Sequence, residues 1–132
     1  MLAACTQVGP EQSAAHAPAM DWHRDPSELA IERWQSVRGA VSADCADYAR
    51  SVEVVWVDDA ADLNARCGLG YSVVGCFEPS DTAPKMLVRG DALAGTLVHE
   101  MMHALEACVQ HTVDNQHSDA QLWRGLMAHD AE

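Results

Sequence analysis

Residues 92–110 constrain the fold more than any other part of this 132-residue chain. This stretch contains no proline and carries the sequence His-Glu-Met-Met-His at residues 99–103, with apolar side chains recurring every fourth residue. That period predicts an amphipathic helix beginning after Gly90 and Asp91, with its apolar face in the core and its polar face bordering a cleft. The expected apolar face comprises Leu93, Leu97, Val98, Met101, Met102, Leu105, Cys108 and Val109.

The two histidines of this motif are spaced to bind one metal ion together. Residues i and i+4 lie about one turn apart on the same face of an α-helix, so His99 and His103 can share a cation. Glu100 lies beside them, where a carboxylate can take a proton from a metal-bound water, as in peptide-bond hydrolysis. The alternative is an amphipathic helix whose polar face carries these residues without a metal.

A catalytic zinc site usually has three protein ligands and leaves the fourth position for water, so a third ligand is needed. The metzincin pattern would place a histidine six residues after the second one, but that position is Val109, which excludes this pattern. His111 would lie about 18 Å along a continuous helix from His99, too far to share an ion with it, so it could serve only if the helix broke near Cys108.

His117 is the better third ligand. It follows a polar loop and opens a second amphipathic segment, residues 118–129, whose apolar face is suited to pack against the motif helix. Such packing would bring His117 near the histidine pair. The other interpretation of His117 is a surface histidine at a helix start, and Asp114 and Asp119 are then the rival ligands, since carboxylates also bind zinc.

The motif and the segment that follows it resemble a known group of enzymes. The sequence His-Glu-Met-Met-His-Ala at residues 99–104 is followed by His-Ser-Asp-Ala-Gln-Leu-Trp at residues 117–123. This pattern resembles the SprT-like and YgjP-like zinc metallopeptidases, in which a third histidine opens the helix after the motif and an aromatic residue follows it. Leu122 stands in the aromatic position here and Trp123 comes next. The resemblance implies Glu100 as general base and, as zinc ligands, His99, His103 and His117.

The five cysteines indicate an oxidising compartment. None belongs to the close Cys-x-x-Cys pairs that are typical of structural zinc sites. We expect Cys67 to pair with Cys76, because the glycines between them let the chain turn back, and Cys45 to pair with Cys108. Four buried free thiols are the alternative.

The N-terminal segment predicts a membrane-anchored protein of the bacterial cell envelope. Cys5 ends the sequence Leu-Ala-Ala-Cys, which resembles the lipobox of bacterial lipoproteins, although four ordinary small residues are the alternative. Residues 6–24 are rich in Ala, Gln, Pro and Ser, so residues 1–24 are predicted to form a flexible tether with the possible lipobox. Residues 25–132 form the single expected domain. No stretch is long and apolar enough to predict a transmembrane span.

The formal charge of −12 argues against a nucleic-acid partner, because a polyanion would be repelled and no basic cluster offsets the repulsion. The expected partner is a protein or peptide substrate. The acidity otherwise favours solubility rather than recognition of a cationic substrate.

The segments before the motif predict a small α+β domain. A helix begins at Asp25-Pro26 and ends at Gly39, and a short helix covers residues 60–66. Three strands are expected at residues 52–57, 71–77 and 85–89. With the motif helix and a C-terminal helix, these elements predict a minimal zincin-like fold with a mixed sheet of about three strands.

In zincin folds the strand before the last lies at the sheet edge above the metal, which here would be residues 71–77. An extended peptide could pair with this edge through backbone hydrogen bonds. Tyr71 could polarise the scissile carbonyl, although a tyrosine on such a strand more often only packs.

These expectations combine into a zinc metallopeptidase, in which Zn²⁺ lowers the pKa of a bound water. Glu100 then accepts the proton as the water attacks and later protonates the leaving amine. The competing hypothesis is a catalytically inactive, zinc-stabilised binding lipoprotein of the cell envelope. A closed site, with Asp114 or Asp119 in the fourth position, would favour that hypothesis.

Overall fold

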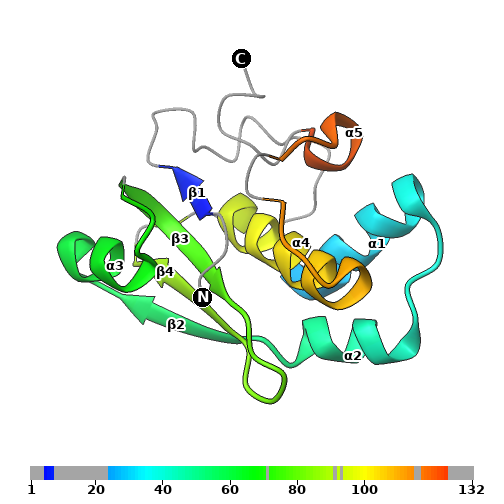
Figure 1. Cartoon of the computed structure of the whole chain (residues 1–132), viewed down its shortest axis with the longest axis horizontal. Coiled ribbons are helices and arrows are strands. Elements are labelled where there is room, and N and C mark those ends of the chain that lie inside the picture. The colour runs from blue at the N-terminus through cyan, green and yellow to red at the C-terminus, as the bar shows by residue number, and fades with distance from the viewer. Residues whose placement is uncertain are drawn as a thin grey trace.

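The computed structural model describes residues 5–7, 24–70, 72–90, 92, 94–114 and 117–124. Within them the fold is α+β, as predicted, with α4 lying between the sheet and α1 (Figure 1). Helix α3 covers the other face of the sheet. The elements in chain order are β1 (Cys5–Gln7), α1 (Pro26–Arg38), α2 (Ala43–Arg50), β2 (Glu53–Val57), α3 (Ala60–Cys67), β3 (Val73–Glu78), β4 (Lys85–Arg89), α4 (Ala94–Gln110) and α5 (Ala120–Trp123).

The predicted starts and ends of the helices follow from their capping residues. Asp25 caps α1 by accepting hydrogen bonds from the N–H and hydroxyl of Ser27, and the helix ends at Gly39 with φ of +100°. Helix α2 was not expected, although Ser42 caps it by accepting from the Cys45 N–H. Of the C-terminal helix expected over residues 118–129, the structure shows α5, and the part beyond residue 124 lies outside the described residues.

The described sheet has four strands in the order β1-β3-β4-β2. Strands β2 and β4 are parallel, whereas β3 runs antiparallel to β4, so the sheet is mixed as predicted. All three expected strands are present, β2 and β3 with ends shifted by one or two residues. The additional strand, β1, comes from the segment for which the composition predicted a flexible tether.

Strand β1 overturns the expectation that residues 71–77 form the edge of the sheet. Thr6 lies opposite Gly75 and Cys5 opposite Cys76, so β3 is an inner strand and β1 takes the edge beside it. The physical reason is that an unpaired strand edge exposes backbone N–H and C=O groups, which another extended segment can pair with. Tyr71 lies outside the described residues.

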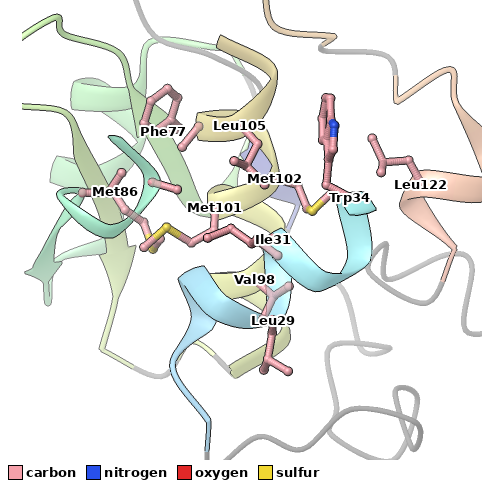
Figure 2. Packing of buried hydrophobic residues seen from close by; sticks show 14 of the residues in the cluster. Leu29, Ile31, Trp34, Phe77, Met86, Val98, Met101, Met102, Leu105 and Leu122 are labelled. Carbon is pink, nitrogen blue, oxygen red and sulfur yellow. The ribbon is translucent and has the colours of Figure 1, made fainter. Parts of the chain in front are cut away.

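Helix α4 is buried on its apolar face as predicted. Figure 2 shows Val98, Met101 and Met102 of α4 packed among side chains of α1 and the sheet. Val109, at the last turn, differs from the expectation because it is 40% exposed. Leu93 lies outside the described residues.

Gly75 lets α4 approach the sheet closely. A Cβ atom at this position would lie 2.9 Å from Cγ1 of Val88 and 3.2 Å from Cγ2 of Thr96 on α4. A side chain at this position would therefore force Val88, Thr96 or both to shift. Thr96 precedes Glu100 by one helical turn, so the contact between Gly75 and Thr96 sets the distance between the motif and the sheet.

Both predicted disulfides are present. Cys45 is bonded to Cys108, which ties α2 to α4, and Cys67 is bonded to Cys76, which ties α3 to β3. Such bonds persist in oxidising compartments. In the described part of the chain, no helix has the length and apolar character needed to cross a membrane.

The two disulfides should differ in how much they stabilise the fold. The Cys45–Cys108 bond spans 63 residues, so its removal by double Ala substitution should lower the free energy of unfolding by about 4 kcal/mol. The Cys67–Cys76 bond spans 9 residues and should contribute about 3 kcal/mol, because a shorter loop restricts the unfolded chain less. Denaturant unfolding of the two double variants measures both values. A larger loss for the shorter loop would contradict this prediction.

Candidate metal centre

The polar face of α4 is enclosed by the fold. His99, Glu100 and His103 are completely buried, and Thr96 on the same helix is buried as well. We expected this face to border a cleft, but α5 and the segment before it cover it. Buried polar side chains are costly unless they are paired or bind a ligand, so this cluster needs a specific explanation.

Three histidines converge at this face. Nε2 of His117 lies 3.1 Å from Nε2 of His103 and 3.2 Å from Nε2 of His99. Within the described residues these three form a group whose geometry could hold a metal ion. Two nitrogens bound to one tetrahedral zinc at about 2.1 Å lie about 3.4 Å apart, so the observed separations are close to those a zinc ion requires.

His117 reaches the pair from the loop after α4 because that loop is tightly hydrogen-bonded. The Asp114 carboxylate accepts hydrogen bonds from the N–H and hydroxyl of Ser118, each at 2.6 Å. The His117 N–H donates to the Asp114 carbonyl oxygen, and His117 has a left-handed backbone with φ of +53°. Such a conformation costs a non-glycine residue free energy, which the hydrogen bonds of the loop help to offset.

Helix α1 holds α5 in place at both ends. Arg38 forms an ion pair with Asp119, the N-cap of α5, and Arg33 donates hydrogen bonds to the carbonyl oxygens of Gln121 and Leu122. These contacts join residues more than 80 positions apart in sequence and fix the segment that carries His117.

The rival third ligands do not join the histidine group. Asp119 is engaged by Arg38 and by the N-terminus of α5, and Oδ2 of Asp114 accepts from Ser118. His111, with a left-handed φ of +59°, ends α4 as an exposed residue. The structure therefore brings together His99, His103 and His117, the set that the sequence resemblance implied.

Glu106 connects the second histidine of the motif to the loop that carries the third. Its Oε1 atom lies 2.7 Å from Nδ1 of His103 and accepts a hydrogen bond of 3.4 Å from the Asp114 N–H. A carboxylate on Nδ1 favours the tautomer whose Nε2 lone pair can bind a metal. Glu106 thus orients His103 and braces the approach of His117.

Burial shifts the pKa values of both His103 and Glu106 toward the uncharged form of each side chain. It lowers the pKa of His103 well below its ordinary value, with the neighbouring histidines adding to the effect. Burial also raises the pKa of Glu106 to about 8. A divalent cation among the histidines would supply the positive charge that a buried carboxylate needs, so the donor set fits a metal ion.

Trp123 forms one wall of the centre. Its ring centroid lies 4.8 Å from that of His99, 4.6 Å from that of His103 and 4.5 Å from that of His117. The indole is 1% exposed, and its Nε1 has no hydrogen-bond partner among the described residues. Trp123 is therefore the aromatic residue that contacts the histidines, while Leu122 is buried in the core.

Sequence reasoning missed Glu106 and Trp123 as parts of the site. Glu106 lies three residues after His103, a spacing at which helical side chains can make contact, so its position does carry a local signal. Trp123 follows Leu122, which stands in the aromatic position of the families that the segment resembles. Its contact with all three imidazoles depends on the tertiary fold and has no local signal.

Comparisons with protein-family models, with curated proteins and with solved structures give no match to this chain. The fold and the site geometry therefore carry the functional argument.

Replacing Glu106 should weaken metal binding without removing a ligand. Loss of the carboxylate that orients a metal-binding histidine typically costs about 10–100-fold in metal affinity. We expect Glu106→Ala to show this loss and Glu106→Gln a smaller one, because Gln keeps an acceptor oxygen for the His103 N–H. Competition for zinc with a chromophoric chelator measures both affinities. Equal affinity of Glu106→Ala and the unmodified protein would show that the contact with His103 does not orient the ligand.

Proposed function

We propose that this protein is a zinc-dependent peptidase, similar in its site to the SprT-like and YgjP-like metallopeptidases. The observation that carries the proposal is the convergence of three histidine nitrogens beside Glu100, on and next to one helix. A zinc ion bound there would supply a Lewis acid that activates water and polarises a peptide carbonyl.

Glu100 acts as the general base in this proposal. It follows His99 directly on α4 and is fully buried. There it takes the proton of the attacking water and returns it to the leaving amine. His99, His103 and His117 would hold the metal, Glu106 holds the ring of His103, and Trp123 keeps bulk water away from one side of the imidazoles.

The engagement of Asp114 and Asp119 supports the enzyme over the non-catalytic binding lipoprotein. A structural zinc site is closed by a fourth protein ligand, whereas a catalytic site leaves that position open. The two carboxylates that could supply the fourth ligand have other partners, because Asp114 accepts hydrogen bonds from Ser118 and Asp119 forms an ion pair with Arg38. The three-histidine set therefore favours an open fourth position.

The proposed location is the bacterial cell envelope. Two disulfides support an oxidising compartment, and the resemblance of residues 2–5 to a lipobox supports a lipid anchor on Cys5. The proposed substrates are proteins or peptides, since the net charge of −12 disfavours nucleic acid.

Metal removal tests this function directly. The purified protein should contain one equivalent of zinc and should cleave fluorescein-labelled casein, an unfolded general protease substrate. Dialysis against 1,10-phenanthroline should abolish cleavage, and added zinc should restore it. Stoichiometric zinc binding with no cleavage of casein or of a mixed peptide library would favour the binding lipoprotein instead.

A further inference from the structure

The chain places its own N-terminal strand where an extended peptide would pair with the sheet. Strand β1 runs antiparallel to β3, and it also contacts α4, the helix that carries the metal-binding motif. Figure 1 shows β1 beside the end of α4 at which that helix begins. The part of β3 nearest the motif is therefore already paired.

The register of the pairing brings β1 close to Thr96 of α4, one helical turn before Glu100. Thr6 lies opposite Gly75. Gly75 packs against α4, because a Cβ atom at this position would lie 3.2 Å from Cγ2 of Thr96. Paired strands lie about 4.8 Å apart, so β1 is one strand spacing from this contact. Glu100 follows Thr96 by four residues and lies on the same side of α4.

From this arrangement we propose that β1 is an internal competitor of peptide substrates. It occupies the edge of β3 to which an extended peptide would bind, and a peptide is cut only after it displaces β1. This inference rests on the proposed peptidase function, and it adds the surface that binds the substrate and the segment that regulates access to it.

The short length of β1 makes displacement feasible. The strand has three residues, and its pairing is irregular between Thr6 and Gln7. The three described residues therefore offer few backbone hydrogen bonds to β3, and short edge strands open at low free-energy cost. A longer peptide can form more of these bonds on the same edge, whereas β1 has the advantage of being linked covalently to the domain.

Proline substitution in β1 tests the proposal in the full chain. The double variant Thr6→Pro/Gln7→Pro removes the backbone N–H groups of both residues, and the matched control Thr6→Ala/Gln7→Ala keeps these groups. If β1 is paired in about nine molecules of ten, the proline variant should lower KM for labelled casein about tenfold. The value of kcat and the zinc affinity should stay unchanged, and the alanine control should behave like the unmodified protein.

A peptide added in trans should reverse the effect. The sequence of residues 2–9 with Cys5→Ser, Leu-Ala-Ala-Ser-Thr-Gln-Val-Gly, should inhibit the proline variant competitively and should inhibit the unmodified protein about tenfold more weakly. A raised KM in the proline variant would instead mean that substrates pair with the outer edge of β1, and it would overturn the proposal. An unchanged KM would overturn it as well.

Hydrogen exchange separates this proposal from the peptidase function. Amides of β3 should lose protection in the proline variant, and the added peptide should restore it, whether or not any substrate is cut. If neither protein cleaves casein but the hydrogen exchange of the β3 amides follows this pattern, the peptidase function is refuted. The competition between β1 and an added peptide for β3 is then still supported. Unchanged exchange in β3 would refute the competition, and this measurement needs no active enzyme.

Discussion

Glu100→Gln should lower the rate of casein cleavage by on the order of 10²–10⁴-fold, the usual effect of losing a general base. Gln has nearly the shape of Glu, so it fits the same buried position, but it cannot accept the proton of the attacking water. Zinc content should remain at one equivalent, because Glu100 does not belong to the histidine group. Steady-state kinetics together with metal analysis of the same sample measures both quantities.

The same substitution at Glu53, an exposed residue of β2, is the matched control. It removes one negative charge from the surface and should leave cleavage unchanged. A Glu100→Gln protein that is as active as the Glu53→Gln protein would rule out Glu100 as the base. Loss of zinc from Glu100→Gln would instead give Glu100 a structural role in the centre.

His117→Ala should weaken zinc binding by on the order of 10³-fold. Structural zinc sites in peptides bind with about 10–16 kcal/mol, so one of four bonds corresponds to roughly 3–4 kcal/mol. The affinity should be measured by competition with a chelator of known zinc affinity. The remaining pair, His99 and His103, should still bind zinc weakly because both lie on α4.

His111→Ala is a close control for this change. His111 and His117 both have left-handed backbone conformations, so Ala introduces the same backbone strain at each position. His111 is exposed at the end of α4, and its replacement should leave the zinc affinity unaltered. Equal zinc affinities for the two variants would exclude His117 as a ligand and would return Asp114 and Asp119 to consideration.

The parts of the site that were predictable from sequence are the local ones. His99, Glu100 and His103 lie within five residues, and helical geometry alone brings the two imidazoles to one face. The Cys67–Cys76 disulfide was predictable for a similar reason, since the two cysteines are nine positions apart and Gly68 and Gly70 let the chain between them turn back. The α+β class followed from the apolar periods of the strands and helices.

The parts that were not predictable depend on contacts between distant segments. The position of α5 depends on contacts with Arg33 and Arg38 of α1, and no local sequence pattern reveals the partner of either arginine. Strand β1 was missed because an Ala-rich and Gln-rich segment has no strand period, and its pairing is determined by the open edge of β3. That pairing also explains why β3 is not the edge strand.

A metal ion held by the histidine group would add a cross-link to the chain. The two disulfides join α2 to α4 and α3 to β3, so neither reaches the segment after residue 108. A metal ion shared by His99, His103 and His117 would act as a third cross-link and would close the loop between α4 and α5. Loss of the ion would leave α5 attached to the domain by α1 and by side-chain packing alone. The metal-depleted protein should then be cut by an added protease between residues 111 and 119 more readily than the metal-loaded protein.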